Sequence, residues 1–317
     1  MSATRRGMDA FALQLMAVLC ALWGMQQVVI KLAAADMSPL LQVGLRSAIA
    51  AVLVALFMLW RRQPFDLADG TVRAGALVGV LFTLEFLTVA EALRHTSAAH
   101  VVVLLYTAPI FSALGLHLLL PGERLRRLQW GGILLAFAGI FVAFGAGALQ
   151  QRLSPQVLLG DVCALLAGLF WGLTTVAVRC SRLAEATAAK TLLYQLVGAA
   201  LLLLPLAWFG GQATEVRFTA PVWVSLLFQG VLVAFVSYLA WFWLLRRYLA
   251  SQLGVCSFLT PLFGVAFGVL LLDETIDAFF VAGGLLVLLG ISLVSADGWW
   301  RRVLGVSAPG ARAADGN

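Results

Sequence analysis

Long apolar stretches alternate with short polar connections along almost the whole chain. A membrane-spanning helix needs about 20 consecutive, mostly apolar residues. Ten stretches meet this requirement: Ala10–Ala33, Pro39–Trp60, Val72–Leu93, Ala98–Leu120, Leu128–Ala146, Val157–Val178, Ala188–Phe209, Pro221–Leu245, Ser251–Leu272 and Ala278–Ala296. The pattern predicts an all-α integral membrane protein with ten transmembrane helices. Because the connections are short, we expect no soluble domain.

Composition supports the same class of protein. Hydrophobic residues are 62% of the 317 residues and charged residues only 11%, with a mean hydropathy of +0.99. Ordinary soluble domains are about 25% charged, so this chain has too few charges to cover a soluble core. The first apolar stretch is too long for a cleaved signal peptide and is followed by further spans, so we expect a retained first helix.

One set of landmarks occurs twice in the chain. Each landmark has a counterpart 151 or 152 positions later: Arg94 and Arg246, Pro109 and Pro261, Glu123 and Glu274, Gly139 and Gly290. Similarly, Trp23-Gly24 and Trp171-Gly172 are 148 positions apart. This regularity predicts a tandem duplication, with residues 1–150 as the first repeat, 151–300 as the second and 301–317 as a tail.

The basic residues predict the orientation in the membrane. If ten spans are assumed, 16 of the 21 Lys and Arg residues fall on one side and 4 on the other, with Arg46 inside a span. The positive-inside rule then places both termini in the cytoplasm. This distribution also accounts for the pI of about 9.6 without any nucleic-acid partner. Five spans per repeat make the two halves cross the membrane in opposite directions, an arrangement typical of alternating-access carriers that bind substrate near the midplane.

These landmarks also resemble a known family. Leu93–Ala99, Pro109 and Gly122–Leu125, together with their second copies and the two Trp-Gly helices, are similar to EamA-type carriers of the drug/metabolite transporter superfamily. The resemblance covers residues 10–296. It implies a secondary carrier of the bacterial inner membrane, with a central cavity between helices one, three and four of each half. In length and pattern, the chain resembles the amino-acid and metabolite exporters of that superfamily.

Three polar residues inside predicted spans leave alternatives open. A charge at mid-membrane is disfavoured by roughly 2.5–3.5 kcal/mol on insertion scales and faces protein or water. Glu85 either binds a substrate ammonium or a coupled proton, or is a structural carboxylate held by Arg46 or a hydroxyl. Arg46 either extends to the membrane surface or binds a substrate carboxylate. His100 is either a proton carrier or a hydrogen-bonded interior histidine.

Two mid-helix tryptophans, Trp23 and Trp171, are equivalent in the repeat and define the expected site. Tyr238 and Trp241 are three residues apart and hence on one helix face. The candidate substrate-binding residues are Trp23, Gln26, Gln27, Glu85, His100, Tyr106, Trp171, Thr174, Tyr238, Trp241 and Ser257. An aromatic pocket with few fixed charges suits a small molecule with an apolar body and a polar head. The alternative is that both tryptophans only pack one half against the other.

We therefore expect a secondary carrier, most simply an exporter of aromatic or neutral amino acids or similar metabolites. A drug or sugar-derivative carrier is the second hypothesis. A membrane enzyme would need clustered catalytic side chains at one interface, and a scaffold would usually carry a soluble output domain; the sequence suggests neither. We expect no catalytic residues, metal site or cofactor. The expected partners are a small-molecule substrate and the lipid bilayer, and a monomer would suffice.

The orientation can be tested by thiol labelling on intact cells. The charge distribution places Ser154 outside and Ser251 in the cytoplasm. On a background without the four native cysteines, Ser154→Cys should react with an impermeant thiol reagent and Ser251→Cys should not. Equal labelling of the two variants would contradict the orientation and the inverted repeat.

Overall fold

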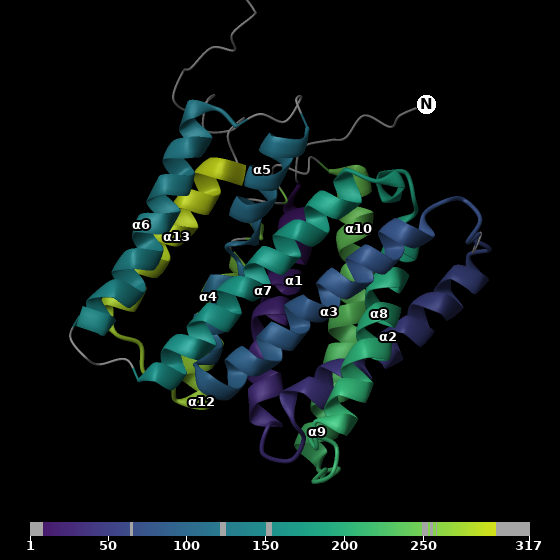
Figure 1. Cartoon of the computed structure of the whole chain (residues 1–317), viewed down its shortest axis with the longest axis horizontal. Helices are drawn as coiled ribbons and strands as arrows, with labels where there is room; N and C mark the ends of the chain where they lie inside the picture. Colours follow the sequence, from purple (N-terminus) through teal and green to yellow (C-terminus); the bar gives the residue numbers. More distant parts are fainter. Residues whose placement is uncertain are drawn as a thin grey trace, which may run out of the picture.

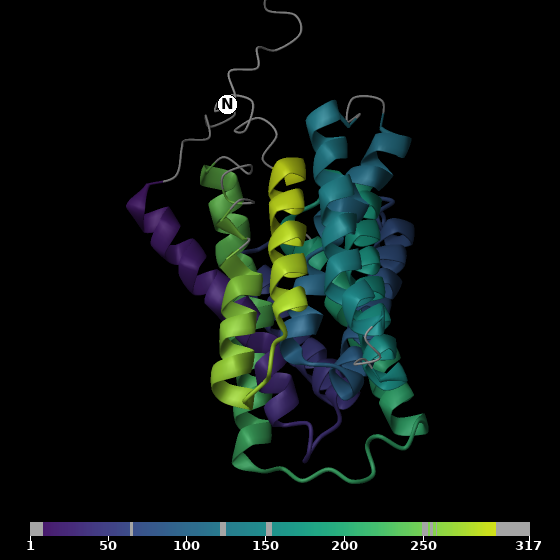
Figure 2. The same cartoon turned by 90° about the vertical axis from the view of Figure 1, so that its left-hand side faces the viewer.

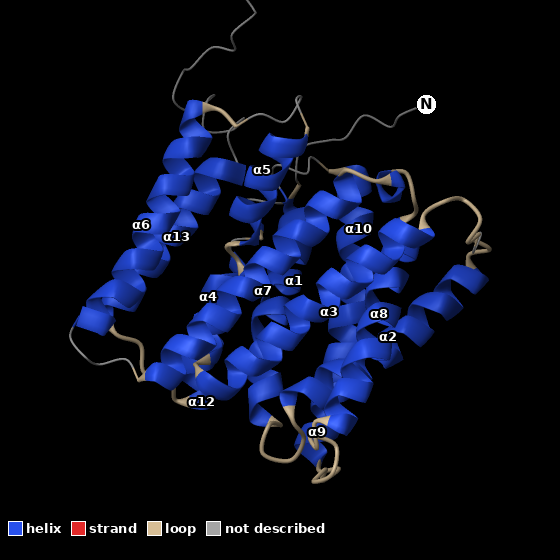
Figure 3. Ribbon diagram, in the orientation of Figure 1, coloured by secondary structure: helices blue, strands red, loops and turns tan. Residues whose placement is uncertain are grey.

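A computed structural model describes residues 9–63, 66–120, 125–149, 154–248, 253, 256–257 and 259–295. Every regular element in these ranges is a helix (Figure 3). Glu123, Ser251, the chain ends and the expected tail at 301–317 lie outside the described residues.

The first half of the chain contributes six helical elements, coloured purple to teal in Figure 1. They are α1 (Ala10–Leu32), α2 (Pro39–Trp60), α3 (Val72–His95), α4 (Ala98–Leu105), α5 (Ala108–Leu119) and α6 (Arg127–Leu149). Several of them begin where sequence chemistry predicts. Ser38 and Ser97 accept backbone N–H groups as N-caps, and Pro39 occupies the first turn of α2, where a missing N–H costs nothing.

The second half continues from teal to yellow. It comprises α7 (Pro155–Arg179), the short η2 (Arg182–Ala184), α8 (Ala188–Phe209), α9 (Ala220–Leu227), η3 (Phe228–Ser237), α10 (Tyr238–Arg247), α12 (Leu259–Leu272) and α13 (Ala278–Ser295). Among the described residues of the whole chain, seven helical segments are long and apolar enough to cross a membrane. Shorter apolar stretches lie in α6, α12 and α13. The protein is therefore a multi-pass membrane protein.

Two expected spans are not continuous α-helices. The fourth is divided into α4 and α5 at Tyr106 and Thr107, because Pro109 has no N–H to continue the helical ladder. The eighth changes from α9 to the π-helix η3 and back to α10. By contrast, α8 continues through Pro205 without a break.

Close contacts between glycines relate the two halves reciprocally. A Cβ added to Gly139 of α6 would lie 2.6 Å from the carbonyl oxygen of Gly283 in α13. A Cβ added to Gly290 of α13 would lie 2.4 Å from the carbonyl oxygen of Gly132 in α6. Adding 151 to the first-half residue of one contact gives the second-half residue of the other, as a two-fold relation between repeats requires. Figures 1 and 2 show the two helices side by side.

The helices that carry the two Trp-Gly pairs, α1 and α7, also make reciprocal glycine contacts with the other half. Gly24 of α1 lies against the backbone of Thr260 in α12, and its counterpart Gly172 lies against the backbone of Ala108 in α5. Small residues recur every fourth position along α7, at Gly160, Ala164, Gly168 and Gly172, and Gly168 lies against the carbonyl of Leu104. Such a strip of small residues permits close helix approach.

At one end of the bundle, a buried polar network joins the halves. Gln42 of α2 accepts a hydrogen bond from Ser225 of α9 at 2.7 Å, and Gln229 of η3 donates to Ser225 at 2.6 Å. All three side chains are fully buried. At the same end, Thr219 donates to Asp36 at 2.8 Å. Cross-half hydrogen bonds therefore satisfy polar groups that lipid could not.

At the other end, Lys190 of α8 holds the connection between α2 and α3. Its ammonium lies 2.6 Å from the Asp69 carboxylate and also donates to the Asp66 carbonyl. Hydrogen bonds from Lys190 and Thr71 lower the pKa of Asp69 to about 2, so the carboxylate stays ionised near neutral pH. This end is the one that the charge distribution assigns to the cytoplasm.

Substitution of one glycine tests the α6–α13 contact. Gly139→Ala would push a methyl group into the backbone of α13, and overpacking of this kind typically costs about 1–3 kcal/mol. Gly131→Ala in the same helix meets no atom within 4 Å and is the matched control. The unfolding temperature in detergent should fall for Gly139→Ala only. Equal unfolding temperatures would mean that α6 and α13 do not pack this closely.

Candidate functional site

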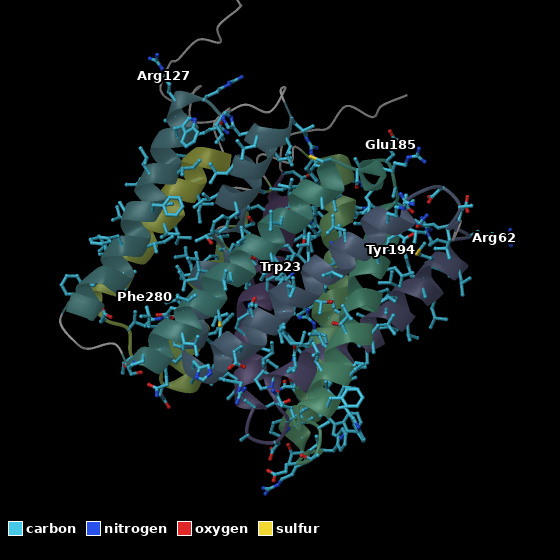
Figure 4. All side chains as sticks on the ribbon, in the orientation of Figure 1. Trp23, Arg62, Arg127, Glu185, Tyr194 and Phe280 are labelled. Carbon is cyan, nitrogen blue, oxygen red and sulfur yellow. The ribbon has the colours of Figure 1, made fainter. Side chains whose placement is uncertain are left out.

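Trp23 connects the middle of α1 to the second half of the chain. Its indole N–H donates to the Ser237 hydroxyl at 2.8 Å, and its ring meets Trp241 edge-on with centroids 5.6 Å apart. Figure 4 shows Trp23 near the centre of the helical bundle. Ser237 is the last residue of η3, and π-helical turns are rare and frequently found at functional sites. The expected Trp23–Trp241 neighbourhood is therefore present, with Ser237 as an added member.

Trp171 makes the corresponding aromatic contact from α7. Its ring meets Tyr106 edge-on at 5.3 Å, and Tyr106 lies at the break between α4 and α5. Each of the two equivalent tryptophans thus packs on an aromatic residue of the other half. Tyr106 lies within electrostatic range of Glu85 and of Tyr238. Because Tyr238 follows Ser237, the partner of Trp23, the two aromatic contacts lie in one region of the bundle.

A basic and an acidic side chain are buried in this region. Arg46 of α2 is fully buried, and its guanidinium lies 3.9 Å from the ring centroid of Phe86. None of its three side-chain nitrogens has a hydrogen-bond partner, which excludes an arginine that extends to the membrane surface. Glu85 of α3 is 5% exposed, and its Oε2 is also unpartnered. Arg46 interacts electrostatically with Glu85 and Tyr238, but no ion pair joins the two charges.

The repeat relates Glu85 to a residue already described. Glu85 and Ser237 are 152 positions apart, as are Arg94 and Arg246. Trp23 bonds to Ser237, whereas no hydrogen bond joins their counterparts Trp171 and Glu85. The packing is unequal as well: α3 packs along much of α7, while α1 has few contacts with η3 and α10. The two halves therefore adopt different local arrangements around equivalent residues.

His100 lies away from this centre, near the end of the bundle assigned to the outside. Its Nδ1 is 2.9 Å from Asp161 of α7, and its ring stacks on Phe280 with centroids 4.1 Å apart. Thr96 donates to the same Asp161 oxygen at 2.7 Å. This geometry is that of the hydrogen-bonded interior histidine. Asp161 was not among the expected residues, although a lone carboxylate within a predicted span was a signal for it.

A cavity of about 530 Å³ lies beside His100. Its polar lining includes Lys31, Arg94, His95, His100, Thr275 and Asp277. Arg94 and His95 both pair with Glu91, at 2.9 and 2.8 Å, as expected for a local interfacial pair between Glu91 and Arg94. The cavity thus forms a polar vestibule at this end of the bundle.

Glu274 connects two elements beside this vestibule. Its carboxylate accepts the backbone N–H groups of Ala98 and Ala99 at 2.7 and 3.0 Å, at the N-terminus of α4. It also lies 3.1 Å from the Lys31 ammonium. A carboxylate at a helix N-terminus is favoured by the unsatisfied N–H groups and the helix dipole. Glu274 therefore has an architectural role, because it links the start of α4 to Lys31 of α1.

The remaining candidate substrate-binding residues lie on α1, on α7 and before α12. Gln26 and Gln27 are buried on α1, and Gln27 Oε1 has no partner. Thr174 donates to the Phe170 carbonyl of its own helix. Ser257 lies in the turn before α12. Within the described ranges, no three His, Cys, Asp or Glu side chains come together in a way that could hold a metal ion.

Comparison with known families agrees with this architecture. The chain matches the EamA-like transporter family over residues 10–145 and again over residues 158–296. The chain belongs to the EamA-like transporter family. This family is part of the drug/metabolite transporter superfamily and consists of transporters, not enzymes. The substrate is therefore a small molecule, and the protein functions within a membrane.

Relatives align over nearly the whole chain. A probable amino-acid metabolite efflux pump of Escherichia coli is 25% identical over 299 residues, which covers 90% of this chain and 95% of that protein. An uncharacterized transporter of Bacillus subtilis, YoaV, is 26% identical, with 85% and 91% covered. A solved crystal structure at 22% identity superposes with a TM-score of 0.63 and covers 93% of this chain and 99% of that one, which shows a common fold.

A double-mutant cycle tests the contact between Trp23 and Ser237. Trp23→Phe and Ser237→Ala should each destabilise the protein in micelles, and the double variant should lose less than their sum. The expected coupling is about 0.5–1.5 kcal/mol, the net value of one hydrogen bond. Trp60→Phe, at a 75% exposed position, should add simply to Ser237→Ala. Additive losses for Trp23→Phe would contradict the hydrogen bond.

Proposed function

We propose that this protein is a secondary carrier that exports amino acids or similar small amphipathic metabolites across the bacterial inner membrane. One observation carries the proposal: aromatic side chains from both halves lie in the same region as a buried arginine and a buried glutamate that do not pair with each other. Trp23, Trp241, Tyr106 and Trp171 offer apolar surface to a substrate body. Arg46 and Glu85 offer charge to its polar head.

Equivalent residues of the two halves have different local contacts, and this difference supports alternating access. A carrier built from two inverted repeats changes its facing direction when the halves exchange local conformations. The bonded pair of Trp23 with Ser237 and the unbonded pair of Trp171 with Glu85 fit one such state. The different packing of α1 and α7 against their neighbours fits it as well. We therefore assign ten spans in two inverted five-span repeats, at residues 1–150 and 151–300.

The proposed orientation of the chain gives the two routes by which a substrate would reach and leave the central site. With both termini in the cytoplasm, the vestibule beside His100 faces the outside. An exported substrate would enter from the end near Lys190 and leave through the vestibule. Both halves of a single chain contribute side chains to the proposed site of aromatic residues, Arg46 and Glu85. A monomer is therefore sufficient for this mechanism.

Counterflow in liposomes tests the function. Purified protein should exchange labelled amino acids within a panel that also contains sugar derivatives and lipophilic drug cations. Trp23→Ala, Trp171→Ala and Tyr238→Phe should lower exchange severalfold and change the substrate ranking, because these side chains would line the site. Their amounts in the membrane should stay normal.

Two results would contradict the proposal. Exchange confined to sugar derivatives or drug cations would assign the protein to the alternative substrate class. Parallel loss of expression and activity, with an unchanged ranking, would mean that the aromatic residues only pack the halves together.

A further inference from the structure

We infer that Arg46 and Glu85 together bind the head group of an α-amino acid, with Arg46 on its carboxylate and Glu85 on its ammonium. This inference rests on the proposed carrier function and specifies its substrate class. It follows from two buried charges that the rest of the fold leaves unsatisfied.

Arg46 has the properties of a carboxylate receptor. A guanidinium presents a planar fork of N–H donors that matches a carboxylate with two parallel hydrogen bonds. Here the fork is fully buried and Nε and both terminal nitrogens have no partner, while the Phe86 ring at 3.9 Å supports the guanidinium. A buried donor without a hydrogen bond raises the free energy of the folded protein, and a ligand carboxylate that accepts from it removes this penalty.

Glu85 has the complementary property on the adjacent helix. It lies near the middle of α3, it is buried, and its Oε2 accepts no hydrogen bond. Phe86, whose ring lies against the Arg46 guanidinium, is the next residue along the same helix. Arg46 and Glu85 interact electrostatically without forming an ion pair. A molecule that carries both charges can therefore pair with both groups at once.

The arrangement discriminates against molecules with one charge or none. An amine would pair with Glu85 and leave the guanidinium unsatisfied, and a simple carboxylic acid would leave Glu85 unsatisfied. A site built around buried polar groups strongly rejects analogues that lack a matching group. Neutral sugars and lipophilic cations satisfy the pair incompletely. Tyr238, which interacts with both Arg46 and Glu85, lies beside the expected head group.

Analogues that lack one charge test this site in the wild-type protein. Liposomes containing the purified carrier are compared for counterflow of phenylalanine and leucine, of the corresponding amines without a carboxylate, and of the corresponding acids without an amino group. Exchange of the amino acids should be at least about tenfold faster than exchange of either analogue. In detergent, the amino acids alone should raise the unfolding temperature, and this measurement needs no variant.

Two variants assign the individual roles. Arg46→Gln should abolish the preference for amino acids over the amines, because the carboxylate partner is lost. Glu85→Gln should abolish the preference over the acids. Arg73→Gln and Glu215→Gln, at exposed positions away from Arg46, Glu85 and the vestibule, are the matched controls and should keep the wild-type ranking. If Arg46→Gln does not accumulate, Arg46→Lys keeps the charge, loses the fork, and should weaken discrimination.

The outcomes separate this inference from the proposed function. Wild-type protein that exchanges amines or acids as well as amino acids would overturn the inference and leave the carrier proposal standing. Unchanged rankings in well-expressed Arg46→Gln and Glu85→Gln variants would do the same. Absence of counterflow for every compound in the panel would overturn both.

Discussion

A charge within the hydrocarbon layer must find its partner inside the protein, and this constraint governs the whole bundle. Several hydroxyls in the described helices obey it by donating to a carbonyl of their own helix, as Thr174 does to Phe170. Other polar groups find partners across helices, such as His100 with Asp161 and the network around Gln42. Arg46 and Glu85 are the exception that matters most. A buried arginine and a buried glutamate that do not pair with each other fit a place kept for a ligand with both an acidic and a basic group, and aromatic residues lie in the same region.

The same bundle must also be able to change shape. Glycine contacts, including Gly139 with Gly283, bring helix backbones close together and relate the halves reciprocally. In contrast, the central contacts of the two halves differ: Trp23 is bonded to Ser237, and Trp171 is not bonded to Glu85. Close packing at the reciprocal contacts and different partners at the centre are what a carrier with two facing directions needs.

Sequence alone predicts what depends on local chemistry. Apolar length locates the helices, Ser and Pro mark several of their starts, and the repeat identifies Trp23 and Trp171 as equivalents. The break at Tyr106 follows from Pro109, which is visible in the sequence. The π-helix η3 and the pairing of His100 with Asp161 depend instead on tertiary packing, which single-sequence patterns do not encode. For the same reason, sequence could name Arg46 and Glu85 as buried charges but could not tell whether they pair with each other.

The most direct measurement is an experimental structure of the purified carrier with an amino acid bound. The ligand carboxylate should lie against the Arg46 guanidinium and its ammonium against Glu85, with its side chain among the aromatic residues. A ligand found only in the vestibule beside Lys31 and His95, with Arg46 and Glu85 still unpartnered, would contradict the assignment of the central site.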